Sequence, residues 1–111
     1  MEPTSLVIVF TTIPADANAT ALARQLIDER LAACINALAP MTSVYRWEGA
    51  IQEESERQLV IKTTTARLDA LKERLHALHP YQVPEFVVLH AADASSRYAQ
   101  WVDDCVAEQE A

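Results

Sequence analysis

The alternation of apolar and polar positions divides the N-terminal part of the chain into short elements. Residues 6–10 form a continuous, mostly β-branched apolar run, which predicts a strand buried on both faces. Residues 17–31 carry leucine and isoleucine at helical spacing, with Asp16 or Asn18 available to cap the helix. A short apolar segment, residues 34–38, follows. The pattern is therefore strand, helix and a second short extended segment.

The middle of the chain predicts a β-hairpin. Residues 42–47 alternate between polar and apolar types, as in a strand. The apolar residues 58–63 predict the strand that returns alongside it. Glu48 and Gly49 stand between them, and Gly49 is the only glycine in the protein. Because glycine tolerates positive φ, this pair predicts a two-residue turn. The charged residues 53–57 suit a protruding ribbon or a sheet edge.

The C-terminal half predicts two more helices with a strand between them. Thr64 or Thr65 can cap the first helix, and Pro80 ends it. The apolar stripe of this helix consists of Leu68, Leu71, Leu75 and Leu78. Residues 86–89 read as a buried strand, and Ser95 caps the last helix. One face of that last helix carries Tyr98, Trp101, Val102, Cys105 and Val106.

The order β-α-β-β-α-β plus a terminal helix predicts an α+β fold of the ferredoxin-like type, a βαββαβ sandwich with an antiparallel sheet and an extra C-terminal helix. Residues 1–111 form one domain, with a core of about residues 5–107. The strands at residues 6–10 and 86–89 are the most apolar, so we expect them at the centre of the sheet. The charged hairpin strands would then form the edges.

Composition and charge exclude several classes of function. The formal net charge is −7, and the basic residues are scattered, which disfavours nucleic-acid binding. No apolar run reaches the about 18 residues that a membrane span needs. The N-terminus carries no positive charge of the signal-peptide kind, so we expect a cytoplasmic protein. Cys34 and Cys105 form no CxxC motif and lie among apolar residues, which predicts buried, reduced and unbridged thiols.

Candidate chemistry is sparse, and no nucleotide-binding, zinc-protease or nucleophile-elbow motif is present, so we expect no enzyme. His76 and His79 have the i, i+3 spacing that can place two imidazoles on one metal. Alternatively, His76 is solvated and His79 caps the helix end. Lys62 and Glu85 are candidate buried charges that either meet each other or face solvent.

Aromatic side chains with polar tips are the other candidates. They are Tyr45, Trp47, Tyr81, Tyr98 and Trp101. Rings of this kind outside the centre of a small sheet indicate a pocket or a partner surface. Ordinary half-buried packing is the alternative interpretation.

Five segments of the chain closely resemble the CutA divalent-cation tolerance proteins. They are residues 31–36, residues 43–51, Glu56 with residues 59–63, residues 79–85 and residues 98–101. The resemblance runs from about Val7 to Val106, nearly the whole chain. The combination of His-Pro-Tyr-x-Val-Pro-Glu with Tyr-x-Trp-x-Gly is specific.

The resemblance implies a cytoplasmic, ferredoxin-like subunit in a tight homotrimer, linked to tolerance of copper and other divalent cations. The family positions associated with copper correspond to Thr11, Leu78 and His79, and of these only His79 is a metal ligand type. We therefore expect weak binding of Cu²⁺ or another divalent cation at His79, with His76 and Glu85 as possible helpers.

The alternative function that the resemblance implies is that of a scaffold similar to the PII signalling proteins. Such a trimer would bind a small molecule or a partner protein in its intersubunit clefts. The predicted lining of the pocket and interface comprises Tyr45, Trp47, Lys62, Tyr81, Glu85, Tyr98 and Trp101. Three of these rings, Tyr45, Trp47 and Trp101, are expected to be buried in the assembled protein.

Overall fold

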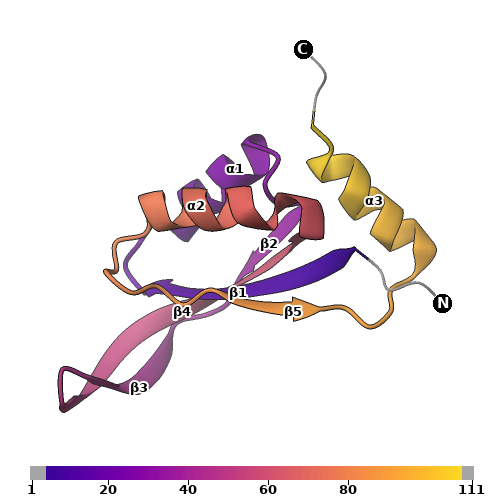
Figure 1. Cartoon of the computed structure of the whole chain (residues 1–111). Coiled ribbons are helices and arrows are strands. Elements are labelled where there is room, and N and C mark those ends of the chain that lie inside the picture. Colours follow the sequence, from indigo (N-terminus) through magenta and orange to yellow (C-terminus); the bar gives the residue numbers. More distant parts are fainter. Residues whose placement is uncertain (1–4, 109–111) are drawn as a thin grey trace.

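A computed structural model describes residues 5–108 and shows an antiparallel sheet with helices packed on it. In chain order the elements are β1 (Leu6–Pro14), α1 (Ala19–Asp28), β2 (Cys34–Ala37), β3 (Met41–Trp47), β4 (Ala50–Thr64), the 3-10 turn η1 (Thr65–Arg67), α2 (Leu68–Leu78), β5 (Val87–His90) and α3 (Ser96–Val106). Helices α1 and α2 cover one face of the sheet, and α3 stands at one end of it (Figure 1). The predicted α+β fold with a split βαβ order is confirmed.

Strand β4 is the centre of the sheet, whose order is β2-β4-β1-β5 with β3 also paired to β4. The outer half of β4 forms the hairpin with β3, which projects away from the helices in Figure 1. The inner half pairs with β1 on one side and β2 on the other. The expectation that residues 86–89 form a central strand was wrong, because β5 pairs only with β1. The expectation that both charged hairpin strands form edges was also wrong, because β4 lies in the centre of the sheet.

The core lies between the sheet and helices α1 and α2. Alternate residues of β1, such as Val9 and Ile13, are fully buried and face the same side as Ile61 of β4. Leu26 of α1 and Leu71 of α2 pack in the same cluster. A smaller cluster under α3 contains Leu6, Ala33, Val102 and Val106. Since no side chain in either cluster is charged, burial of apolar surface is the main stabilising term here.

The other face of the sheet is not covered by α1 or α2 (Figure 1), and α3 packs against it only at the end that carries Leu6. Ile8 and Phe10 of β1 are half-buried on this face, opposite Leu89 and Val87 of β5 in the register. Val87 is 45% exposed and Leu89 is 49% exposed. We call this surface the open face. It leaves a group of apolar side chains in contact with water in the single chain.

The predicted turn and the predicted cap of α1 are present, whereas α2 begins later than predicted. Glu48 and Gly49 have φ of 49° and 79°, so the predicted two-residue turn is confirmed. Asn18 caps α1 by accepting a hydrogen bond from the amide of Ala21 at 3.0 Å. Thr64 makes no side-chain cap, and α2 begins only at Leu68, after the 3-10 turn.

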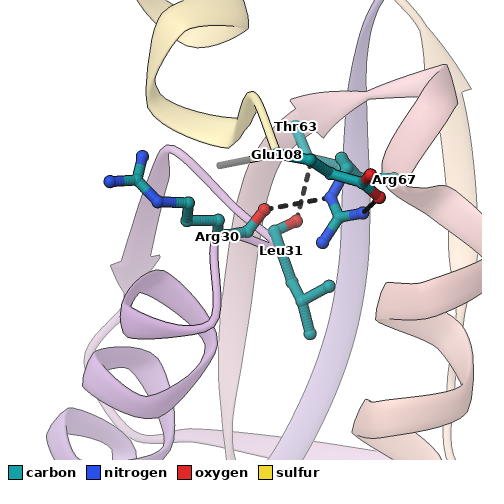
Figure 2. A network of polar contacts seen from close by, with 5 residues as sticks. All are labelled: Arg30, Leu31, Thr63, Arg67 and Glu108. Carbon is teal, nitrogen blue, oxygen red and sulfur yellow. Dashed lines mark hydrogen bonds and ion pairs between the residues drawn. The ribbon is translucent and has the colours of Figure 1, made fainter. Parts of the chain in front are cut away.

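A polar junction joins three segments that are far apart in the sequence (Figure 2). Arg67 donates from Nε to the carbonyl of Arg30 at 3.1 Å and forms a 2.7 Å ion pair with Glu108. The hydroxyl of Thr63 donates to the carbonyl of Leu31 at 2.8 Å. The loop after α1 is therefore fixed to the start of α2 and to the segment after α3. Because these carbonyls belong to a loop, side-chain donors satisfy them in place of the backbone partners that a helix or a strand would supply.

Both cysteines are free thiols, and each is half-buried rather than fully buried as the sequence predicted. Cys34 begins β2, opposite Lys62 of β4. Cys105 packs at the margin of the small cluster under α3. The difference arises because neither cysteine is one of the fully buried residues of a core cluster.

Candidate functional site

A cavity of about 660 Å³ lies between the β3–β4 hairpin and residues 80–85, which join α2 to β5. We call it the hairpin cleft. The residues that matter for its chemistry are Thr12, Tyr45, Trp47, Glu56, Tyr81 and Glu85. Four of the predicted site residues are brought together here: Tyr45, Trp47, Tyr81 and Glu85. Its size falls in the range that holds small organic ligands.

Strand alternation places the aromatic wall of the cleft. Tyr45 and Trp47 are two apart on β3, so both side chains leave the same face of the hairpin. Glu56 is on that face as well, because it pairs directly with Met41, which is in phase with Tyr45. Glu56 also pairs with Pro14 on β1, so the hairpin cleft continues onto the sheet. The opposite wall is a series of bends over residues 80–83, and the prolines at 80 and 84 fix the φ angle at each end of it.

Glu56 and Tyr81 form the best-defined polar contact of the cleft. Glu56 is only 6% exposed, and its Oε2 accepts a hydrogen bond from the Tyr81 hydroxyl at 2.6 Å. Burial raises the pKa of Tyr81, and so do the hydrogen bond to Glu56 and the charge of that carboxylate. The phenol therefore stays protonated and donates. A bond this short is typical of a hydroxyl donating to an ionised carboxylate.

Glu85 is held by the sheet rather than by Lys62. The amide of Gln58 donates to Glu85 Oε2 at 3.1 Å and to the carbonyl of Thr11 at 2.7 Å. Lys62 donates instead to Asn36 on β2. The predicted alternative in which Lys62 meets Glu85 was therefore wrong. The two residues lie at different positions along the sheet, so Lys62 is not part of the hairpin cleft.

His79 lies behind the cleft and uses both of its ring nitrogens. The imidazole is 8% exposed, with Nε2 2.7 Å from the carbonyl of Thr12. Its Nδ1 accepts a hydrogen bond from the amide of Tyr81 at 3.1 Å. Since Nδ1 accepts, the proton is on Nε2, which donates to the carbonyl. Burial lowers the pKa of His79, and the bond to Thr12 opposes this effect.

The residues proposed with His79 for the metal site do not form a ligand cluster within the described part of the chain. His76 lies exposed on α2 with its Nδ1 2.7 Å from the carbonyl of Lys72. Thr11 is fully buried, and its hydroxyl has no hydrogen-bond partner within residues 5–108. Leu78 packs against the core. Across these described residues, no three His, Cys, Asp or Glu side chains form a group that could hold a metal ion.

The remaining aromatic candidates are on α3. The rings of Tyr98 and Trp101 pack against each other with centroids 5.6 Å apart, and both side chains are partly exposed. They do not line the hairpin cleft. The predicted set therefore divides into a cleft group, the Lys62–Asn36 pair and the α3 pair.

Sequence reasoning missed Glu56 and Gln58 as site residues. Glu56 is one of the residues that carry the family resemblance, but it ends a run of carboxylates that indicates a solvated surface. The available signal was strand phase: a two-residue turn pairs Tyr45 with Gln52, and counting by two from Gln52 leads to Glu56 on the same face. Gln58 has no such signal, because a polar residue between charged and apolar segments is ordinary.

The fold and the cleft together define an α+β protein of the split βαβ type with a projecting hairpin. The family model described as "CutA1 divalent ion tolerance protein" matches residues 7–105. The divalent-cation tolerance protein CutA of Thermus thermophilus is 45% identical over 95 residues, which cover 86% of this chain and 92% of that protein. The protein of the same name in Escherichia coli O139:H28 is 40% identical over 100 residues, covering 90% and 89%.

A solved structure agrees with these sequence matches. The structure of CutA from Synechococcus elongatus PCC7942 has a TM-score of 0.89 and 37% identity, covering 96% of this chain and 95% of that one. The chain belongs to the CutA1 divalent ion tolerance protein family. The expected family resemblance is confirmed. No helix within residues 5–108 has the length and apolar character needed to cross a membrane.

Proposed function

We propose that this chain acts in the cytoplasm as a homotrimeric, non-catalytic divalent-cation tolerance protein. The observation that supports assembly is the open face, whose apolar side chains Val87 and Leu89 are 45% and 49% exposed in the single chain. The hairpin adds to this, because Val44 is 61% exposed and Ile51 is 69% exposed. A two-stranded ribbon is marginally stable alone in water, so a neighbouring subunit is the natural support.

Analytical ultracentrifugation tests the assembly. At micromolar concentration we expect a sedimentation-equilibrium mass of three chains, unchanged on moderate dilution. Trimers rather than dimers are expected from the family resemblance. A mass equal to one chain at that concentration would show that the open face and the hairpin are stable without partners.

For the metal, we propose weak binding of Cu²⁺ or another divalent cation at His79, with His76 or Glu85 as helpers. Family membership supports binding of a divalent cation. We expect the binding to be weak because both ring nitrogens of His79 already take part in hydrogen bonds. A metal must replace one of these bonds, and useful affinity generally needs three or four protein donors. Another subunit could provide donors that one chain lacks.

A calorimetric titration with copper chloride, on wild type and on His79→Ala, tests this site. We expect weak binding to wild type and its loss in the variant. Submicromolar affinity that survives His79→Ala would place the metal elsewhere. No binding at millimolar copper would leave the metal tolerance role indirect.

The hairpin cleft supports a second candidate function, that of a PII-like scaffold which binds a small molecule or a partner protein. The cavity volume and the polar contacts that fix Glu56, Tyr81 and Glu85 favour it. The cleft continues onto the open face through Thr12, so in a trimer it would border the next subunit. Screening small metabolites by thermal shift, in parallel with the metal titration, separates this candidate from the first.

A further inference from the structure

We propose that the hairpin cleft binds a small organic ammonium ion. This inference rests on the proposed small-molecule function of the same cleft and names the chemical class of the ligand. Three observations carry it: two fixed carboxylates without a cationic partner, three aromatic side chains around the same cavity, and the absence of basic side chains from its described lining.

The charge of the cleft is uncompensated. Glu56 is almost completely buried, and its one described partner is the neutral Tyr81 hydroxyl. Glu85 is likewise bonded to a neutral amide, that of Gln58. Within residues 5–108 the ion pairs are Arg67–Glu108 and Arg74–Glu29, so neither cleft carboxylate is paired. A buried carboxylate is stabilised by a nearby cation, and here the cavity leaves space for one.

The aromatic side chains that line the cavity favour one kind of cation. Tyr45 and Trp47 from β3 and Tyr81 from the opposite segment all line the cavity. Ring faces attract alkylammonium groups, whose hydration is weak, and sets of such rings are the usual recognition element for quaternary ammonium ligands. Divalent metal ions are less suited, because they require several oxygen, nitrogen or sulfur donors at short distance. Both carboxylates already use one oxygen in a hydrogen bond.

Anions and neutral ligands fit the cleft less well. Its described lining contains no lysine, arginine or histidine. The Tyr81 hydroxyl, which could donate to an anion, is committed to Glu56. An anionic ligand would meet two negative charges, and a neutral one would leave them unpaired. The cavity of about 660 Å³ also exceeds what an ammonium group alone would fill, which indicates a ligand with an organic body.

Choline and its neutral isostere 3,3-dimethylbutan-1-ol provide a direct test, because they differ in charge and hardly in shape. Both are titrated calorimetrically into the full-length protein in its native assembly. We expect saturable binding of choline, and binding of the alcohol about tenfold weaker or more, as the loss of the cation–π and carboxylate attraction implies. Equal binding of the two, or no choline binding at ten-millimolar concentration, would overturn the proposal.

Two matched variants locate the site. Glu56→Gln keeps the side-chain size and an acceptor for Tyr81 but removes the charge, and we expect choline binding to weaken about tenfold. Glu53→Gln removes the same charge from the same strand, but Glu53 pairs with Val44 and faces away from the cleft. We expect it to bind choline as wild type does. Equal effects of the two variants would mean general electrostatics rather than a site.

Further measurements separate this proposal from the proposed function. If Glu56→Gln disturbs folding, Glu85→Gln replaces it, and melting temperature and sedimentation mass verify the state of each variant. A wild-type trimer that does not discriminate choline from the alcohol would overturn the ammonium site alone. A single-chain mass would overturn the trimer, whatever the choline result.

Discussion

Two buried threonines show that the same residue type can contribute to stability in opposite ways. Thr11 on β1 and Thr63 on β4 are both fully buried. The Thr63 hydroxyl donates to the carbonyl of Leu31, as Figure 2 shows, while the Thr11 hydroxyl has no partner in the part of the chain described. A buried hydroxyl without a hydrogen bond costs free energy, because its bonds to water in the unfolded chain are not replaced.

Replacing each threonine by valine should therefore give opposite results. We expect Thr11→Val to raise the free energy of unfolding by about 1 kcal/mol, since it removes an unpaired hydroxyl and keeps the shape. Thr63→Val should lower it by about 1 to 2 kcal/mol, because the carbonyl of Leu31 loses its donor. Urea denaturation of the two variants beside wild type measures both. Destabilisation by Thr11→Val would show that its hydroxyl is bonded in solution.

The pH dependence of stability should report on His79. Burial lowers its pKa in the folded chain below the unfolded value of about 6.5, so the folded state favours the neutral ring. The stabilisation is present above the unfolded pKa and is lost as pH falls through the folded pKa. Protonation would place a hydrogen on Nδ1, which now accepts from Tyr81.

Thermal melting at pH 7.5 and at pH 5 measures this effect. We expect wild type to lose more stability over this interval than His79→Gln does, because the variant cannot be protonated at this position. The variant should be less stable than wild type at pH 7.5 by about 1 to 2 kcal/mol. An identical loss in both proteins would mean that other groups govern the acid response.

At the scale of elements, the β3–β4 hairpin has two different faces. The face with Tyr45 and Trp47 borders the hairpin cleft, and the other carries Val44, opposite Glu53. In the single chain Trp47 is partly exposed, which leaves a large amphipathic ring with only part of its surface packed. Such rings commonly supply the central contacts of an interface.

Truncating this ring should weaken assembly. We expect Trp47→Ala to destabilise the trimer by on the order of 2 kcal/mol for each ring removed, since large aromatic anchors carry much of the energy of an interface. Sedimentation velocity over a dilution series should show dissociation at higher concentration than for wild type. Lys72→Ala, at an exposed position of α2 far from the hairpin, is the control. A Trp47→Ala protein that keeps its mass on dilution and its melting temperature would contradict the expectation.

For the whole molecule, periodicity predicted the order of elements, and apolar content did not predict the order of strands. Residues 86–89 read as a central strand because they are apolar, yet Val87 and Leu89 lie on the open face of an edge strand. An apolar sequence indicates that a strand is buried, but it does not indicate which element covers that strand. For the same reason the rings of the cleft were recognisable from sequence as amphipathic, whereas Glu56 was hidden among surface carboxylates.

The central position of β4 has a consequence for synthesis on the ribosome. Leu6 of β1 pairs with Thr64, and Pro14 pairs with Glu56, so the first strand is made long before its partner. Until β4 has emerged, β1 has neither of its two neighbours in the sheet, since β5 is made later still. Such distant pairings raise contact order and slow folding. The nascent N-terminal strand therefore exposes an apolar, unpaired edge for most of translation, the period in which a holding chaperone would protect it.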